Sequence, residues 1–403
     1  MYHCRLAGDD VTVLSNTRQE GELMKVSKTN FRYLLLGSVA ALLTINAAAT
    51  PTSTHPGTTD AKSANPTEFI YAANQAAENV SGYRIELKNG KLSKLPGSPY
   101  RSGRYPVSIS MSPDSRFVYA ANQGSATVSG YSVDPDNGSL KPVTGSPFSV
   151  GDYPDAVKVA PNGRFAYVTS EDGNIVTPYK IDPATGALTK AGQAAATGAH
   201  PISITVSPDS RFAFVSNYND DSVSAYRIDR HSGVLTAVGK AVKTDMHPIY
   251  MIVSKDNRFI YVANYGTATV SAFRIDPADG QLTEVPGSPF VAGSQPYSVT
   301  IDPTNRFVYV ANWGSRNLSA FRRDDKTGAL TEIEGSPYAT GWFPYAVVVD
   351  PDDDYVYVAD NGAGTITAYH LDPDSGALSK VAGSPFQAEP GPYALTVGAL
   401  GSH

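Results

Sequence analysis

The stretch from Arg306 to Leu330 reads RFVYVANWGSRNLSAFRRDDKTGAL, and close copies begin at Arg116 (RFVYAANQGSATVSGYSVDPDNGSL) and Arg258 (RFIYVANYGTATVSAFRIDPADGQL). The aromatic residue that opens the motif recurs at a spacing of 47 or 48 residues, at Phe69, Phe117, Phe165, Phe212, Phe259, Phe307 and Tyr355. Self-similarity at a fixed period of this length indicates a solenoid, a propeller or an array. The repeat therefore decides the architecture before any single residue is considered.

Each repeat unit predicts four short strands. In one unit these are Tyr297–Asp302, Phe307–Ala311, Leu318–Arg322 and a strand that starts near Gly328. Apolar and polar residues alternate within them, and turn residues stand between them, as is typical of half-buried strands. Pro and Asp preset the intervening turns, and Gly supplies positive φ.

The ends of the repeat region predict a closed ring. The first copy begins at its second strand, at Glu68, and the last copy is followed by a lone first strand, Tyr393–Val397. A solenoid would need atypical capping units, and none is visible in the sequence. We therefore predict an all-β fold over residues 68–398, a seven-bladed β-propeller with four-stranded blades. The C-terminal strand would complete the first blade and close the ring.

The N-terminal part predicts export. A basic stretch that includes Lys25 and Arg32 precedes an apolar run from Tyr33 to Ile45, and small residues at 47–49 follow. This order is typical of a secretory signal, and the run is short for a membrane span. We interpret residues 1–49 as an export signal with its true start at Met24, and residues 50–67, rich in Thr, Ser, Ala and Pro, as a flexible linker. The predicted location is periplasmic or secreted, without a membrane span in the mature chain.

Composition excludes several classes of function. The net charge is −6 and the pI is about 5.7, which disfavours nucleic-acid binding. The single cysteine, Cys4, lies in the predicted export signal, so we expect neither disulfides nor thiol chemistry. We expect no cofactor and no metal: Asp350–Asp354 and Asn219–Asp221 lack the spacing of a calcium loop and are interpreted as turn charges. The mature protein is expected to be a monomer.

Two rings of residues should lie on one face of the propeller, here called the mouth face. The first, the pre-proline ring, precedes the Pro of each inner strand: Tyr105, Tyr153, His200, His247, Gln295, Phe343 and Gly391. The second, the post-strand ring, follows the last residue of each second strand: Gln75, Gln123, Glu171, Tyr218, Tyr265, Trp313 and Asn361. Aromatics and amides around a concave mouth suit sugars and small organic acids. The Asn residues that end most second strands are good turn formers, so we expect a structural role for them, with hydrogen bonding to a ligand as the alternative.

The candidate site follows from departures from the repeat. The third and fourth units lack the Gly-Ser-Pro of the other outer edges, and they lead into His200 and His247. Glu171 is the only acid in the post-strand ring. Departures from the pattern of a repeat are expected at functional sites. A His side chain can act as a general base near neutral pH. The predicted catalytic residues are His200, His247 and Glu171, with polar lining as the alternative role for each His. The predicted substrate-binding residues are Tyr153, Asp155, Tyr218, Tyr250, Tyr265, Tyr297, Trp313 and Tyr345.

The repeats resemble a known family. Phe259–Asn264 (FIYVAN) and Ser207–Phe212 (SPDSRF) are similar to motifs of the seven-bladed lactonase family, which includes 6-phosphogluconolactonase-like proteins, and of the related YVTN propellers. The resemblance implies a lactone opened by a His, a Glu and Arg residues near the channel mouth. His200 resembles the family His, whereas the family Glu position holds Tyr265 and the Arg position falls at Tyr297 or His247.

Two functions follow as hypotheses. The first is an exported lactonase-like hydrolase, a carboxylic ester hydrolase acting on a sugar-acid or related lactone, with a small-molecule lactone or carbohydrate as its partner. The second is a non-catalytic YVTN-type propeller that binds a glycan, a peptide or a protein partner on the same face.

Overall fold

The computed structural model describes residues 4–7, 10–13, 24–26 and 67–400. The chain divides into two units, Met1–Ser38 and Val39–His403. In the first unit, the antiparallel strands β1 (Cys4–Ala7), β2 (Asp10–Val13) and β3 (Met24–Val26) form one sheet in that order. The apolar run of the predicted export signal and residues 50–66 of the predicted linker lie outside the described residues.

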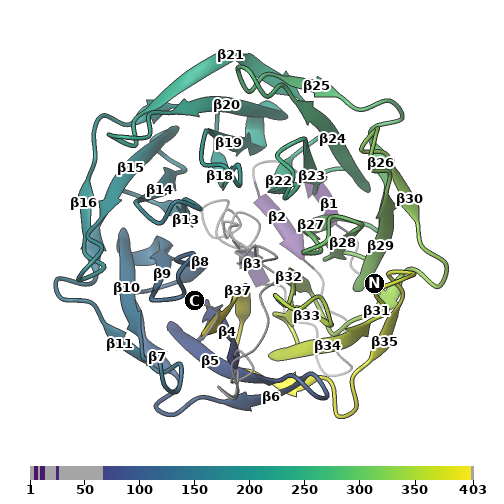
Figure 1. Ribbon diagram of the computed structural model, residues 1–403. Coiled ribbons are helices and arrows are strands. Elements are labelled where there is room, and N and C mark those ends of the chain that lie inside the picture. The colour runs from purple at the N-terminus through teal and green to yellow at the C-terminus, as the bar shows by residue number, and fades with distance from the viewer. Residues whose placement is uncertain (1–3, 8–9, 14–23, 27–66, 401–403) are drawn as a thin grey trace, which may run out of the picture. The chain divides into compact units, whose positions relative to one another are not determined.

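Seven antiparallel sheets form a ring in the second unit (Figure 1). The innermost strand of every sheet starts at a Pro: β37 (Pro392–Leu400), β8 (Pro106–Met111), β13 (Pro154–Val159), β18 (Pro201–Val206), β22 (Pro248–Val253), β27 (Pro296–Ile301) and β32 (Pro344–Val349). The second strands are β4 (Thr67–Asn74), β9 (Phe117–Asn122), β14 (Phe165–Ser170), β19 (Phe212–Asn217), β23 (Phe259–Asn264), β28 (Phe307–Asn312) and β33 (Tyr355–Asp360). The third strands are β5 (Asn79–Glu86), β10 (Thr127–Val133), β15 (Ile175–Ile181), β20 (Ser222–Ile228), β24 (Thr269–Ile275), β29 (Asn317–Arg323) and β34 (Thr365–Leu371). We number the sheets as blades 1 to 7, beginning with the blade of β37 and β4.

The outer strand of each blade is short, and in six blades it is interrupted. Its pieces are β6 (Lys91–Lys94) and β7 (Tyr100–Arg101), β11 (Leu140–Pro142) and β12 (Phe148–Ser149), β16 (Leu188–Lys190) and β17 (Ala195–Ala196), β25 (Leu282–Glu284) and β26 (Phe290–Val291), β30 (Leu330–Glu332) and β31 (Tyr338–Ala339), and β35 (Leu378–Lys380) and β36 (Phe386–Gln387). Both pieces pair with the third strand of their blade. In five of these blades the Ser of Gly-Ser-Pro bridges the interruption, as where Gly130 N–H donates to Ser146 Oγ (2.9 Å). Blades 3 and 4 both lack this Ser; the outer strand of blade 3 is still interrupted, whereas blade 4 has one continuous outer strand, β21 (Leu235–Lys243).

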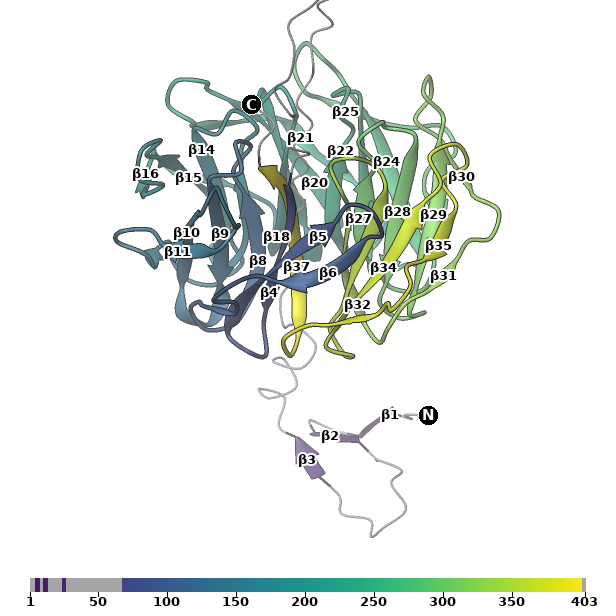
Figure 2. The same ribbon diagram turned by 60° about the horizontal axis from the view of Figure 1, so that its bottom comes forward.

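The ring closes between the two ends of the repeat region, which confirms the predicted seven-bladed propeller. Strand β37 pairs antiparallel with β4, from Pro392 opposite Asn74 to Leu400 opposite Thr67. The two strands lie side by side in Figures 1 and 2, although they come from opposite ends of the described ring. The C-terminal strand therefore completes the first blade.

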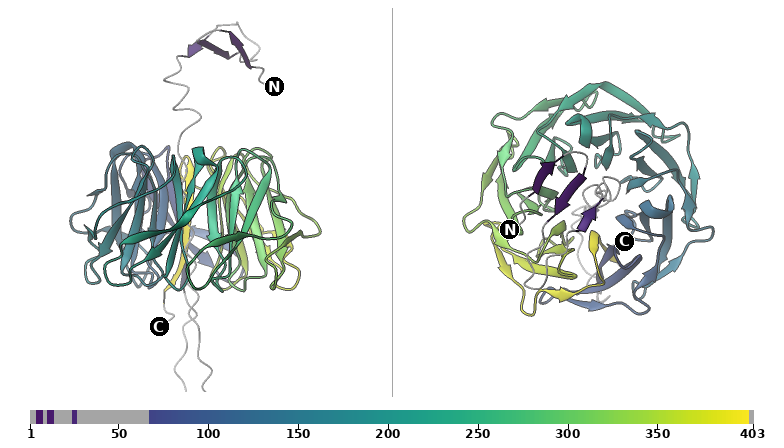
Figure 3. Two further views of the ribbon diagram at one scale, coloured as in Figure 1. Left: turned by 90° about the horizontal axis from the view of Figure 1, so that it is seen from above. Right: turned by 180° about the vertical axis from the view of Figure 1, so that it is seen from behind.

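A repeated contact between neighbouring blades explains why the motif contains its Phe, Tyr and Gly. A Cβ on Gly328 would stand 2.4 Å from the Phe259 ring of the preceding blade, so only Gly permits this approach. Tyr261 Oη donates to the carbonyl of the same Gly at 2.8 Å. The contact recurs across the closure, where the Tyr355 ring meets Gly90 and Tyr357 Oη donates to the Gly90 carbonyl at 3.0 Å. The junction of blades 7 and 1 is therefore packed by the same contact as the other junctions. Figure 3 shows the blades following one another around the ring.

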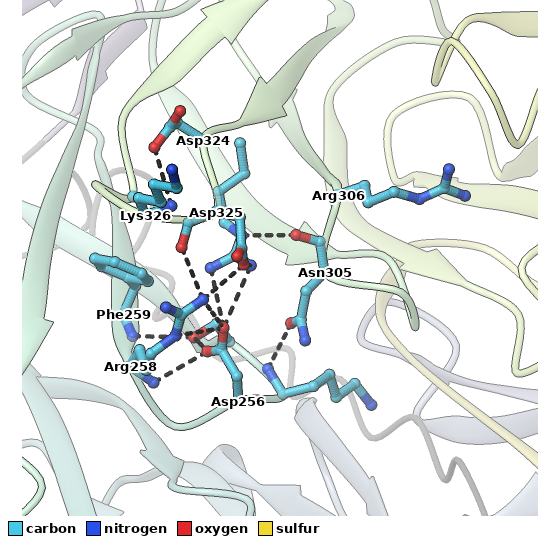
Figure 4. A network of polar contacts seen from close by, with 12 residues as sticks. Asp256, Arg258, Phe259, Asn305, Arg306, Asp324, Asp325 and Lys326 are labelled. Carbon is cyan, nitrogen blue, oxygen red and sulfur yellow. Dashed lines mark hydrogen bonds and ion pairs between the residues drawn. The ribbon is translucent and has the colours of Figure 1, made fainter.

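The Arg that precedes most opening aromatics serves this packing. The Arg258 guanidinium lies 5.5 Å from the Phe259 ring, and equivalent Arg residues stack on the aromatics of blades 2, 3, 4 and 6. Arg258 also pairs with Asp325 of the next blade at 2.6 Å. In that blade Arg323 replaces a buried aliphatic residue of the repeat and binds Asp256 and Asp325. Figure 4 shows Arg258 between Asp256 and Asp325 in this network. Ion pairing between blades is thus concentrated at the junction of blades 5 and 6.

The helices of the described residues are two 3-10 turns, η1 (Gln123–Ser125) and η2 (Tyr218–Asp220). No helix in residues 4–7, 10–13, 24–26 or 67–400 could cross a membrane.

Candidate functional site on the mouth face

The pre-proline and post-strand rings are joined residue by residue. In every blade, the backbone N–H of the post-strand residue donates to the carbonyl of the pre-proline residue; for example, Tyr218 N–H donates to His200 O at 2.9 Å and Tyr265 N–H to His247 O at 2.9 Å. All seven pre-proline residues have positive φ, a conformation that is costly for a residue other than Gly. Because this turn is the same in all blades, chemical differences around the mouth come from the side chains.

The Asn residues at the second-strand ends have a structural role. Asn122 is fully buried, and its Nδ2 donates to Thr127 Oγ1 (3.1 Å) and Ser129 Oγ (2.9 Å) at the start of the next strand. The equivalent Asn residues make the same pair of contacts in blades 1, 4, 5 and 6. These side chains hold the third strand to the second and are not available to a ligand.

A polar chain crosses blades 2, 3 and 4 on the mouth face. His200 Nε2 lies 2.8 Å from Glu171 Oε1, and both side chains are largely buried. Gln123 Nε2 donates to Asp155 Oδ1 at 2.8 Å and, at 3.5 Å, to Glu171 Oε2. The structure thus brings together three of the predicted site residues, and it adds Gln123. Gln123 belongs to the post-strand ring but was not predicted, because a neutral amide carries no catalytic signal in the sequence.

The two predicted catalytic histidines differ in their surroundings. The Tyr218 ring stacks on His247, with centroids 4.4 Å apart and planes 8° apart, and lies 5.5 Å from the His200 ring. Among the described residues, His247 forms no ion pair, whereas His200 has Glu171. Among the described residues, His200 therefore has a carboxylate partner, whereas His247 has an aromatic one.

The remaining predicted tyrosines gather around the inner ends of blades 5, 6, 7 and 1. Tyr297 Oη and Tyr393 Oη are 2.6 Å apart, and the Tyr345 ring lies 4.3 Å and 4.5 Å from their rings. Tyr250 and Tyr265 each lie 6.0 Å from Tyr297 by ring centroids. Tyr393 was not among the predicted residues, although it occupies the position equivalent to Tyr297 and Tyr345.

Aromatic contacts continue from this tyrosine group along the mouth face. Trp313 lies 6.1 Å from Tyr265 and stacks on Phe343 at 4.7 Å, with planes 16° apart. Phe343 is a pre-proline residue that we did not predict as part of the site. The carbonyl of Tyr153, a predicted binding residue, accepts a hydrogen bond from the Glu171 N–H at 3.0 Å.

Burial keeps the site phenols protonated. It raises the pKa of Tyr218 to about 12, with smaller effects of Tyr265 and Asp221, and the pKa of Tyr345 to about 12. Burial likewise raises the pKa values of Tyr250 and Tyr297 well above the ordinary value. At neutral pH these residues are hydrogen-bond donors and not phenolate nucleophiles.

A separate cleft of about 280 Å³ lies away from the mouth, between blades 4 and 5. Arg211, Arg258 and Arg274 line it together with Asp209 and Asp256. Because the first two Arg residues recur in equivalent positions of other blades, we attribute this cleft to blade packing.

Comparison with known proteins identifies the family of the chain. A sequence model of the family described as "Lactonase, 7-bladed beta-propeller" matches residues 24–152, 147–251 and 250–341. The chain belongs to this family. No curated protein sequence matches the chain significantly. In this lactonase-type propeller the acid beside His200 is Glu171.

Solved structures show the same fold. A Bacteroides uniformis protein for which a 6-phosphogluconolactonase activity is proposed superposes with a TM-score of 0.73 at 18% identity, covering 83% of this chain and 100% of its own. The periplasmic gluconolactonase of Pseudomonas aeruginosa superposes with a TM-score of 0.69 at 20% identity, covering 83% of this chain and 99% of its own. At these identities the likeness concerns the fold.

Proposed function

We propose that this lactonase-type propeller hydrolyses the lactone of a sugar acid or a related lactone. The observation that carries the proposal is the His200–Glu171 pair, 2.8 Å apart on the mouth face. When Nε2–H donates to Glu171, the neutral imidazole keeps its lone pair on Nδ1 for a proton from water. Glu171 then stabilises the imidazolium that forms.

The reaction would need two proton transfers. Water attacks the acyl carbon while His200 takes its proton, and the ring C–O bond then breaks as the imidazolium returns a proton to the leaving oxygen. The product is the open hydroxy acid. A protonated phenol such as Tyr218 can donate a hydrogen bond to the oxyanion, because burial holds its pKa at about 12.

Charge at the site favours a lactone without a phosphate group. Asp155 is fully buried and Glu171 nearly so, and both are bridged by the neutral Gln123. A phosphate would call for Arg or Lys donors, whereas the expected Arg position holds Tyr297 or His247. The expected substrate is therefore closer to gluconolactone than to its 6-phosphate. The relationship to the P. aeruginosa protein supports a periplasmic or secreted location, which we propose together with export by residues 1–49.

A panel of sugar lactones tests the proposal. The rate of acid release is measured with the wild type and with His200→Ala, after subtraction of spontaneous hydrolysis. We expect a loss of about 100-fold or more in kcat for His200→Ala, since general acid–base groups contribute at least that much. Wild-type hydrolysis no faster than the buffer background would contradict the proposal.

A specific observation favours the second candidate function, a non-catalytic binding propeller. Tyr105, Met246 and Trp342 are about half exposed, at 45%, 51% and 58%, and each lies in the pre-proline ring or directly before it. Arg316 stacks on Trp342 at 4.4 Å. Exposed aromatics on the mouth face suit a glycan or peptide. Glycan-array binding that survives His200→Ala, without any lactone hydrolysis, would select this function.

A further inference from the structure

The repeat changes its charge at the junction where the ring closes. The residue before the opening aromatic is Arg in five units: Arg116, Arg164, Arg211, Arg258 and Arg306. In the last and first blades the same position holds Asp354 and Glu68. These two blades meet at the closure, where Glu68 is paired by its backbone with Ala399 of the C-terminal strand. Two successive positive charges are thus replaced by negative ones at this junction, which we call the seam.

Glu68 is a buried carboxylate without a hydrogen-bond partner. Its exposed fraction is 0%, and neither Oε1 nor Oε2 accepts a hydrogen bond from any described residue. The backbone N–H of Asp352 lies near it without completing a hydrogen bond of normal geometry. A buried charge is normally paired or coordinated to a metal, because desolvation is expensive. Glu68 therefore points to a cationic partner.

A second buried carboxylate, Asp350, interacts electrostatically with Glu68. Asp350 also has an exposed fraction of 0%. Its Oδ1 accepts the backbone N–H groups of Asp354 and Tyr355, both at 2.8 Å, while its Oδ2 has no partner. The exposed Asp352 and Asp354 interact electrostatically with Glu68 as well. Among the described residues, no Lys, Arg or His forms an ion pair with any of these four acids.

Burial and the neighbouring negative charges disfavour the ionised forms of Glu68 and Asp350. Burial, followed by the charges of Asp350, Asp352 and Asp354, raises the pKa of Glu68 to about 9. Burial raises the pKa of Asp350 to about 7, against the lowering effect of its two N–H donors.

We propose that Glu68, Asp350, Asp352 and Asp354 bind a divalent cation, with Ca²⁺ as the best fit, across the seam between blades 7 and 1. Ca²⁺ prefers carboxylate oxygens and tolerates irregular coordination, whereas Mg²⁺ demands near-ideal octahedral geometry. In the described residues no three such side chains already surround a common point. The exposed side chains of Asp352 and Asp354 therefore rotate toward the two buried carboxylates when the cation binds.

The proposed site differs from a contiguous calcium loop. Residues 350–354 alone lack the required spacing, which is why the sequence suggested turn charges. Ring closure brings Glu68 to them from the other end of the propeller. A cation held by both blades would bind only the closed ring and would stabilise it in proportion to RT ln(1 + [Ca²⁺]/Kd).

Thermal unfolding tests the proposal independently of any enzymatic activity. The full chain is treated with chelator, and melting temperatures are measured at pH 7.5 with added CaCl2 or MgCl2. We expect Ca²⁺ at 100 times its Kd to raise the melting temperature by roughly 5 °C, and Mg²⁺ to raise it less. Glu68→Gln and Asp350→Asn should abolish the Ca²⁺ response. The matched control Asp209→Asn should retain it, because Asp209 is the blade 4 equivalent of Asp352 and blade 4 is in contact with neither blade 7 nor blade 1 in the order of the ring.

Terbium luminescence provides a second readout that does not depend on folding of the variants. Tyr357 interacts electrostatically with Glu68 and Asp350, so it can sensitise Tb³⁺ bound there. We expect Tb³⁺ emission in the wild type that Ca²⁺ displaces. Two outcomes would overturn the proposal: no Ca²⁺-displaceable emission, or a Glu68→Gln variant that is more stable than the wild type while the wild type ignores Ca²⁺. The latter would show that protons alone occupy the seam.

Discussion

Removing the closing strand is the sharpest perturbation of the fold. A chain that ends at Gly391 lacks β37 and leaves the inner edge of β4 unpaired. Three large side chains of β37, Tyr393, Leu395 and Val397, have exposed fractions of 0–1% in the intact ring. At about 1.5–3 kcal/mol for each buried side chain, the loss is about 5–9 kcal/mol. This is comparable with the whole stability of a typical domain, about 5–15 kcal/mol.

The assay is urea denaturation followed by far-ultraviolet circular dichroism. We expect the truncated chain to lose its cooperative transition or to aggregate through the open edge of β4. A chain that ends at Leu400 is the control and should unfold like the wild type. A peptide spanning residues 392–400 should restore part of the transition when added to the truncated protein. A truncated chain that unfolds cooperatively at the wild-type midpoint would refute closure by β37.

Three further predictions concern packing and charge. Gly328→Ala should cost about 2–4 kcal/mol in urea denaturation, because its φ is +80° and the new Cβ would stand 2.4 Å from Phe259; a cost below 0.5 kcal/mol would contradict the proposed blade contact. Arg323→Ile restores the aliphatic residue of the repeat but removes the charged hydrogen bonds of Arg323 and leaves Asp256 with Arg258 alone, so we expect a cost of about 2 kcal/mol that is smaller in an Asp256→Asn background; additive costs would exclude coupling. In chelating buffer, the free energy of unfolding should fall as the pH rises from about 4.5 to 9, because the pKa of Glu68 is raised from 4.5 to about 9 and the folded state holds the proton. The pH dependence of the urea midpoint across this range should be weaker in Glu68→Gln. An unchanged dependence in that variant would assign the effect to another group.

The fold could be predicted from the sequence because every unit carries the same local signals. The Phe, Tyr and Gly of the repeat are now explained by one contact, in which the Phe259 ring packs on Gly328 and Tyr261 donates to its carbonyl. A recurring contact of this kind leaves a period in the sequence. The interruption of the outer strands was less visible, because it depends on the side chain of Ser146 reaching the Gly130 N–H across a turn.

The candidate site was predictable only in part. His200 and Glu171 could be singled out because they depart from the repeat, and the structure places them 2.8 Å apart. Gln123 and Phe343 were not predicted as site residues, because amides and aromatics occur around the whole ring and their residue types do not distinguish them. The proposed cation site could not be predicted from the sequence for another reason. Glu68 and Asp350 belong to blades 1 and 7, which meet only after the ring has closed.

The most direct test of the proposed site compares its two histidines and its acid on one substrate. The kcat/KM for glucono-1,5-lactone is measured for the wild type, His200→Ala, His247→Ala and Glu171→Gln. We predict losses of about 100-fold or more for His200→Ala and about 10-fold or more for Glu171→Gln, with His247→Ala affecting mainly KM, because only His200 has a carboxylate partner among the described residues. Equal activity of the wild type, His200→Ala and Glu171→Gln would contradict the account.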